Sequence, residues 1–208
     1  MKVLLLNGSP HAKGCTWRAL SEVEKTLQAE GIETELIQVG HRDIRGCISC
    51  DKCRELGHCV FNDIAVEIGE KFKAADGLVV GSPVYYGMAN GTLTNLLCRM
   101  FFSSNYEKRM KVGAAVVTCR RSGNTATMDQ LNKFFTINEM PVVSSQYWNN
   151  VHGFSSEDVE KDLEGLQTMR TLARNMAFMM RAIAAEKEKN GLPMGEAEHM
   201  FTSFPDGK

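Results

Sequence analysis

Three short runs of this chain are apolar without interruption, and they restrict the fold more than any other feature. They are KVLLL (2–6), GLVVGS (77–82) and VGAAVV (112–117). A strand with one face in water alternates apolar and polar residues, whereas a strand covered on both faces gives a continuous apolar run. The runs therefore predict strands of a parallel sheet with helices packed on both of its faces.

Segments with helical periodicity separate these strands. We expect helices over 16–30, 64–75, 90–102 and 124–137, and further strands over 34–39 and around PVVSS (141–145). With a last helix after 155, five strands alternate with five helices, which predicts an α/β fold with a doubly wound, five-stranded parallel sheet. We expect one domain over 1–208, with a cysteine-rich loop at 46–59 and an arm over about 191–208.

The last predicted helix is unusually long. It begins near Ser156 and runs to Asn190, which corresponds to about 50 Å at ~1.5 Å per residue. Two interpretations are open. The Met-rich stretch MAFMMRAI (176–183) packs on another subunit, or the helix faces its own core and breaks near Gly165.

The composition excludes several classes of protein. The formal net charge of -1 gives no general attraction to nucleic acid or anionic lipid. We find no apolar stretch of about 18 residues that could span a bilayer, and the apolar start is too short for a signal peptide. We therefore expect a cytoplasmic protein with no nucleic-acid or membrane partner. In that compartment clustered cysteines indicate metal or redox chemistry more often than disulfides.

Ligands of open α/β sheets bind beyond the carboxyl ends of the strands, so the loops there are informative. The loop from Asn7 to Thr16 has two glycines, a serine and a threonine, and no acidic residue. Backbone amides at a helix start suit a phosphate group, and a plain strand–helix turn is the alternative. The loop matches neither the Walker A nor the Rossmann glycine pattern.

The loops after the next two apolar runs are also unusual. Adjacent tyrosines, Tyr85 and Tyr86, suit the binding of a flat heterocycle, or else they cap the edge of the core. In TCRRSGN (118–124), either Arg120 or Arg121 meets an anion, or both are solvated.

Together GSPHAKGCT, GSPVYYG and TCRRSGN resemble the flavin-contacting loops of the flavodoxin-like NADPH-dependent FMN reductase family. The similarity covers roughly residues 1–185 in element order, and GSPVYYG is its most specific piece. The resemblance implies a flavodoxin-like fold that binds FMN, with the phosphate on Ser9, Cys15 and Thr16. The isoalloxazine ring would lie against Pro83–Met88, with further contacts from Thr118–Asn124.

At position 15 the family commonly has Asn, whereas this chain has Cys15. A thiol is a weaker hydrogen-bond donor, although the backbone amide of Cys15 can still serve. The cofactor-binding residues that the resemblance implies are Ser9, His11, Gly14, Cys15, Thr16, Pro83, Val84, Tyr85, Tyr86, Gly87, Met88, Thr118, Arg120, Ser122, Gly123 and Asn124.

Four of the seven cysteines, Cys47, Cys50, Cys53 and Cys59, are spaced C-x2-C-x2-C-x5-C. Soft thiolates select zinc or an iron–sulfur cluster. Zinc sites usually use two separated C-x2-C pairs. Three cysteines at successive three-residue steps instead favour a [4Fe–4S] cluster, with the fourth cysteine reaching the last iron. A zinc site and free or redox-active thiols remain alternatives.

The remaining thiols have simpler interpretations. Cys98 lies on an apolar helix, so we expect it in the core. Cys119 is expected in the core as well, or else in contact with the flavin loop.

The cysteine run is similar to the motif of the iron–sulfur flavoproteins, a branch of the flavodoxin-like group. That resemblance implies a [4Fe–4S] cluster that exchanges electrons with FMN. It also implies an oligomer, a homodimer or homotetramer, that brings the two centres together.

The resemblance implies an oxidoreductase in which NAD(P)H or another donor reduces FMN. Electrons then pass to a cluster, to a quinone, free flavin or other small acceptor, or to a ferredoxin-like protein partner. We assign no catalytic side chain, because the sequence shows no Ser/His/Asp grouping or paired carboxylates, and the five histidines are scattered.

Other function classes stay open. One is an FMN-binding electron carrier or redox sensor without a substrate of its own. The others are an FMN reductase with free cysteines and no cluster, and a zinc-stapled interaction protein that binds no flavin.

Overall fold

Helices and strands alternate along the chain much as the apolar runs predict. The computed structural model describes residues 1–196, 200 and 202, so the rest of the expected C-terminal arm lies outside the described residues. The elements are β1 (Lys2–Asn7), α1 (Cys15–Ala29), β2 (Glu33–Gln38), α2 (Cys53–Leu56), α3 (Ile64–Lys73), β3 (Gly77–Tyr85), β4 (Met88–Ala89), α4 (Gly91–Ser103), β5 (Val112–Cys119), α5 (Asn124–Thr136), β6 (Asn150–His152), α6 (Ser156–Val159) and α7 (Leu163–Asn190).

The strands β2, β1, β3, β5 and β6 lie side by side in that order and run parallel. Leu5 of β1 pairs with Leu36 on one side and with Val79 on the other. The short β4 adds an antiparallel pairing to the end of β3. Strand order reverses between β1 and β3, which confirms the doubly wound topology and marks the expected ligand edge.

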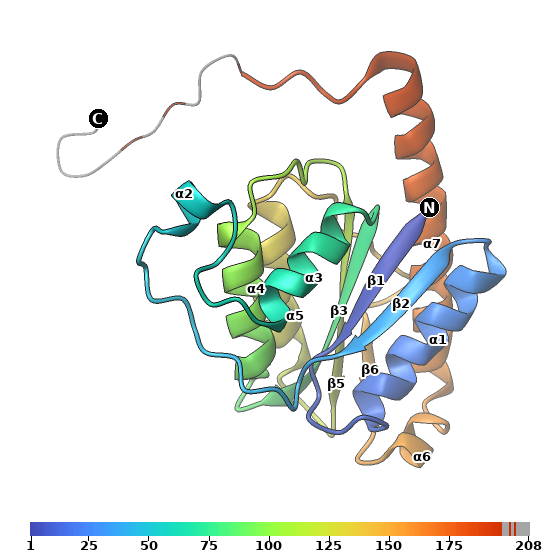
Figure 1. Ribbon diagram of the computed structural model, residues 1–208. Coiled ribbons are helices and arrows are strands. Elements are labelled where there is room, and N and C mark those ends of the chain that lie inside the picture. Colours follow the sequence, from blue (N-terminus) through green and yellow to red (C-terminus); the bar gives the residue numbers. More distant parts are fainter. Residues whose placement is uncertain (197–199, 201, 203–208) are drawn as a thin grey trace.

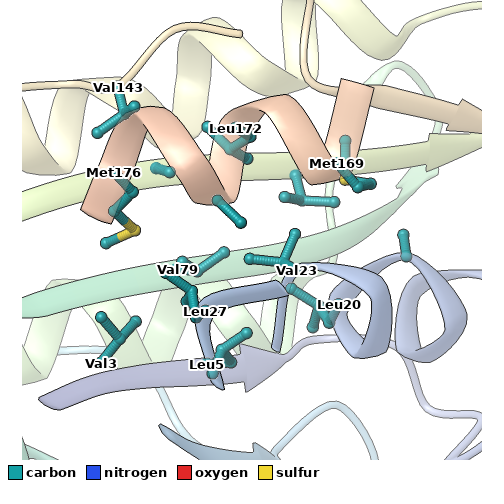
Figure 2. Packing of buried hydrophobic residues seen from close by; sticks show 14 of the residues in the cluster. Val3, Leu5, Leu20, Val23, Leu27, Val79, Val143, Met169, Leu172 and Met176 are labelled. Carbon is teal, nitrogen blue, oxygen red and sulfur yellow. The ribbon is translucent and has the colours of Figure 1, made fainter. Parts of the chain in front are cut away.

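Each central strand contributes side chains to two separate cores. Val3 and Leu5 pack on the face covered by α1 and α7, while Leu4 and Leu6 pack on the face covered by α3, α4 and α5. Figure 1 shows these two helical layers on opposite sides of the sheet. Figure 2 shows the first core, where Leu172 of α7 lies above the strands. Burial on both faces explains why the strand sequences are apolar throughout.

The C-terminal helix faces its own core but is interrupted earlier than expected. Met176 and Met180 are buried against the sheet, which confirms the core-facing interpretation. The interruption falls between α6 and α7, where the Asp162 carboxylate caps α7 by accepting from the Gly165 amide at 2.9 Å. The expected break near Gly165 was therefore slightly misplaced. None of the helices in the described residues is both long and apolar enough to cross a bilayer.

The expected strand at 141–145 is confirmed only at one position. Only Val142 pairs there, through an isolated bridge to Gly113, and the fifth parallel strand is β6. Val142 pairs with Gly113 of β5, and Asn150 pairs with Val117 of the same strand. The chain has more residues between Val142 and Asn150 than β5 has between the two partners, so the extra residues form a loop. Side-chain bonds replace the ladder in this loop: Asn149 donates to the Val143 carbonyl at 3.3 Å, and Ser145 Oγ bonds Asn149 Oδ1 at 2.7 Å.

Gly113 is required by the close approach of α5 to β5. A Cβ atom on Gly113 would lie 2.5 Å from Cγ of Phe135. We therefore expect Gly113→Ala to lower the free energy of unfolding by about 1–3 kcal/mol, because the buried ring must shift. Gly91→Ala is the matched control, since a Cβ atom added to Gly91 on α4 would meet nothing within 4 Å. Urea unfolding of both variants checks this, and an unchanged midpoint for Gly113→Ala would contradict it.

Candidate functional site

The loops that follow β1, β3 and β5 meet around one cleft. Its volume is about 860 Å³, and it lies at the carboxyl ends of the parallel strands. It is lined by Ser9, Pro10, His11, Ala12, Lys13, Gly14, Cys15, Thr16, Pro83, Val84, Tyr85, Thr118, Cys119, Arg120, Gly153, Phe154, Ser155 and Ser156. The structure thus brings the three predicted loops together at the predicted edge of the sheet.

Two amide side chains, buried Asn7 and half-buried Gln38, fix the first loop. Asn7 at the end of β1 accepts from the Ser9 amide at 3.1 Å and donates to the side chain of Gln38. Gln38 in turn donates to the Ser9 carbonyl at 2.6 Å. A Cβ atom on Gly40 would lie only 2.2 Å from the Gly8 carbonyl oxygen, so the loop after β2 packs directly on it. The loop is therefore held in shape by contacts within the fold.

The end of this loop presents hydrogen-bond donors to the cleft. Ser9 Oγ accepts from the His11 amide at 3.1 Å, which leaves the hydroxyl hydrogen available to a ligand. Helix α1 begins at Cys15, and its N-cap is Gly14, which has no side chain to occupy the first amides of the helix. Such a helix start favours an anion, because its amides and its dipole both point toward the ligand.

Thr16 connects the first loop to the third. Its buried hydroxyl lies 2.8 Å from the hydroxyl of Thr118, the next-to-last residue of β5. Because one hydroxyl donates to the other, only the donor's hydrogen is used, and the second hydroxyl can still donate elsewhere.

The second loop is a tight hairpin between β3 and β4. Tyr85 pairs with Met88, and the tip residues Tyr86 and Gly87 both have left-handed backbone angles, with φ of 52° and 75°. This is the geometry of a type I′ turn. The Tyr85 side chain lines the cleft, while Tyr86 at the tip is fully exposed.

The third loop packs against this hairpin. Gly123 has φ of 85°, and a Cβ atom there would lie 2.9 Å from Val84 and 3.1 Å from Gly87. Six of the predicted cofactor residues lie in this outer wall, beyond the residues that line the cleft: Tyr86, Gly87, Met88, Ser122, Gly123 and Asn124. The other ten line the cleft directly, and the assignment of all sixteen to a cofactor stays a prediction.

A fourth side of the cleft was missed from the sequence. Gly153–Ser156 follow β6 and also line the cleft. They were missed because the fifth strand was placed too early in the chain. The helix start near Ser156 was itself predicted, and a capping box that joins Ser155 to Asp158 marks it, but no strand was expected directly before it.

Two thiols in the cleft are held in their neutral form. Burial raises the pKa of the Cys15 thiol, and the carboxylates of Asp158 and Glu157 add to the effect. Burial also raises the pKa of Cys119, which is 6% exposed and lines the cleft. Cys119 is thus buried, as one interpretation predicted, and its contact with a flavin loop stays a prediction.

The four clustered cysteines line a second, much smaller pocket. Cys47 and Cys50 are exposed, and the residues just before and just after Cys50, Ser49 and Asp51, have left-handed backbone angles. The Ser49 amide donates to Cys47 Sγ at 3.4 Å. Across the described residues, no group of three or more His, Cys, Asp or Glu side chains is arranged to hold a metal ion. The thiols therefore share a pocket without converging on one point.

A buried arginine beside this pocket was also missed. Arg99 of α4 has a fully buried side chain that makes paired bonds to Asp63 at 2.7 and 2.9 Å. Its Nε atom donates to Cys59 Sγ at 3.3 Å. Burial opposes the charge of Arg99, but the hydrogen bonds to Asp63 and Cys59 outweigh it and raise the pKa of the guanidinium. An arginine three residues after Leu96, within the apolar stripe of a helix, was the available signal.

The core placement expected for Cys98 was wrong. Cys98 is exposed on α4, where it lines a shallow apolar groove together with Cys47, Phe102 and Ile137. The helix turns Leu97 and Met100 inward instead, because successive residues of a helix point in different directions.

Comparison with known proteins identifies the relatives of this chain. Residues 1–154 match the sequence model of the NADPH-dependent FMN reductase family. An iron–sulfur flavoprotein of Methanocaldococcus jannaschii is 35% identical over 191 residues, which cover 88% of this chain and 99% of that relative. The chain belongs to this reductase family, in its iron–sulfur flavoprotein branch. Membership supports FMN-dependent oxidoreduction as its chemistry.

Solved structures agree on the fold. RosB with bound 8-demethyl-8-formylriboflavin-5'-phosphate is similar with a TM-score of 0.72 at 16% identity, over 99% of this chain and 94% of RosB. A flavodoxin from the domain Archaea is similar with a TM-score of 0.59 at 14% identity, over 87% of this chain and 99% of the flavodoxin. The flavodoxin-like fold is therefore confirmed.

The burial of Cys15 predicts an order of thiol reactivity in this reductase-family chain. The thiolate is the reactive form, so a raised pKa lowers its fraction at neutral pH. In protein stripped of cofactors and metal, we expect iodoacetamide at pH 7 to label Cys15 at least tenfold more slowly than exposed Cys50. Labelling of Cys15 should rise through the alkaline range. Peptide mass spectrometry over a pH series measures both rates, and equal labelling at pH 7 would contradict the prediction.

Proposed function

We propose that this chain is an FMN-dependent oxidoreductase that passes electrons from NAD(P)H or another donor to a small-molecule or protein acceptor, using a [4Fe–4S] cluster at Cys47, Cys50, Cys53 and Cys59. One observation carries the proposal: three loops far apart in sequence line a single cleft at the carboxyl edge of the sheet. FMN supplies two-electron chemistry when bound, and an iron–sulfur cluster supplies one-electron transfer.

The first loop fits the phosphate of FMN. The Ser9 hydroxyl and the backbone amide of Cys15 are donors at the start of α1, where the helix dipole favours an anion. The Thr16 hydroxyl is a third donor when Thr118 donates the bond between the two threonines. The raised pKa of Cys15 keeps its thiol neutral, so no thiolate repels the phosphate. Lys13 also lines this end of the cleft and adds positive charge.

The second and third loops fit the ring system. Pro83, Val84 and Tyr85 form an apolar wall, and apolar and aromatic surfaces of this kind hold flat heterocycles while excluding water. Gly123 packs closely against Val84 and against Gly87 of the hairpin that follows, so the wall is formed before any ligand binds. Preformed walls lower the cost of ordering the site on binding.

The cysteine loop fits a cluster by its donor chemistry. Four thiols face one pocket, and donors to sulfur come from the Ser49 amide and from Arg99. Hydrogen bonds to sulfur are among the features that set the potentials of such clusters. The thiols are not yet gathered around one point, so the loop must tighten when the cluster forms. An FMN reductase with free cysteines is the second candidate, and this same lack of convergence favours it.

Electron transfer between the two centres is proposed to involve a second copy of the chain, as a homodimer or homotetramer. Among the described residues, the cleft and the cysteine pocket share no lining residue. An apolar groove that includes exposed Phe102 and Ile137 adjoins Cys47, which supports protein contact beside the cysteines. A ferredoxin-like partner is the alternative occupant of that surface.

Ser9 provides a test of the phosphate site. We expect Ser9→Ala to weaken FMN binding by about 10- to 100-fold, because a hydrogen bond to a charged group contributes about 1.5–3 kcal/mol. Flavin fluorescence titration of the flavin-free protein measures the dissociation constant. Ser21→Ala is the control, since Ser21 lies farther along α1 and does not line the cleft. Equal affinities for wild type and Ser9→Ala would place the phosphate elsewhere.

The decisive experiment is an absorption spectrum of protein purified without oxygen, with flavin, iron and sulfide assayed on the same sample. We expect about one flavin and four irons per chain, with flavin bands and a broad cluster shoulder. Cys53→Ser should lose iron while keeping FMN, and Cys98→Ser should keep both. Flavin without iron would leave the cluster-free reductase, and absence of flavin would overturn the main proposal.

A further inference from the structure

Arg99 makes more contacts than a structural ion pair requires. A guanidinium has five N–H donors in a rigid fork. At Arg99, Nη1 donates to Asp63 and to the Arg45 carbonyl at 3.4 Å, and Nη2 donates to Asp63 and to the Phe61 carbonyl at 2.8 Å. These bonds fix the plane of the fork. The remaining Nε–H is thereby aimed at Cys59 Sγ.

The same arginine joins the ends of the cysteine loop. Arg45 lies just before Cys47, while Phe61 and Asp63 lie just after Cys59. The guanidinium also lies over the Phe61 ring at 5.2 Å, and the guanidinium of Arg45 lies over the same ring at 4.5 Å. Cys59 is separated by five residues from the compact cysteine run. It is therefore the thiol that most needs an external group to hold it near the other three.

We propose that Arg99 is a positioning residue that holds Cys59 as the fourth cluster ligand and, paired with Asp63, sets the charge at that corner of the cluster. This inference rests on the proposed function, because it requires that the four cysteines bind a cluster. A buried cation beside a thiolate stabilises the extra electron of a reduced cluster, and its paired carboxylate opposes that effect.

The test uses two variants with opposite expected results. In Arg99→Met, the bond to Cys59 is lost and Asp63 is left unpaired, so the midpoint reduction potential of the cluster should fall. In Asp63→Asn, the guanidinium keeps its positive charge without its counter-ion, so the potential should rise. Asn at 63 can still accept from the Ala65 amide and cap α3, which preserves the fold. We expect shifts equivalent to about tenfold in the reduction equilibrium, which is 59 mV for one electron.

Cluster retention provides a second readout. A chelator should remove the cluster at least tenfold faster from Arg99→Met than from wild type. The cluster's absorption in anaerobic protein measures this rate. Arg181→Met is the control, because Arg181 pairs with Glu30 on the other side of the sheet, in the α1–α7 layer. It should match wild type in both measurements. If Arg99→Met fails to fold, Asp63→Asn still tests the predicted rise in potential.

The outcomes separate this inference from the proposed function. Wild type without iron overturns both. Wild type with a cluster, combined with unchanged potential and retention in Arg99→Met, overturns the role of Arg99 alone. Potentials that shift in the same direction in both variants would indicate general loosening of the loop, and would also overturn it. Opposite shifts support it, since a merely structural role gives no reason for opposite signs.

Discussion

Burial of β1, β3 and β5 on both faces is the constraint on which the rest of the structure depends. A strand between two apolar layers must satisfy its backbone groups within the sheet, and it leaves no room for polar side chains along its length. Polar residues are therefore displaced to the strand ends, as with Asn7 and Thr118. Because the strands run parallel, their carboxyl ends lie at the same edge of the sheet. The cleft is a direct result of how the core is built.

Hydrogen bonds at that edge hold the neighbouring loops in one arrangement. Asn7, Ser9 and Gln38 connect the ends of β1 and β2, while Thr16 and Thr118 connect α1 with β5. The bond between Asn7 and Ser9 is local, but the bonds of Gln38 and of Thr118 link segments that are distant in sequence, so the shape of the cleft depends on several strands of the sheet. Buried polar groups of this kind are costly when unpaired, which gives the loop one preferred conformation.

Much of this arrangement could be predicted from the sequence, and the exceptions have physical reasons. The continuous apolar runs identified three central strands, and the glycine-rich turns after them identified the ligand edge. The fifth strand was misplaced because Val142 and Val143 are as apolar as a strand, while the bonds from Asn149 that loop the chain out are invisible to periodicity. Arg99 was missed because a charged residue is ordinarily assigned to solvent. Its partner Asp63 caps a different helix, α3, so the sequence pattern of α4 gives no sign of the pair.

Helix α4 makes hydrogen bonds to the cysteine loop and to the residues that flank it. Arg99 donates to Cys59 within the loop, and Asn95 donates to the Ile44 carbonyl just before it. In the described part of the chain, neither of the two cores contains any of the four clustered cysteines, Cys47, Cys50, Cys53 and Cys59. Small zinc domains depend on their metal to fold at all, because they have little other core. Here the hydrophobic sheet supplies the folding energy without help from sulfur ligands. A folded chain can thus form independently of the iron supply, and insertion of the proposed cluster would be a separate, later step in the maturation of the protein.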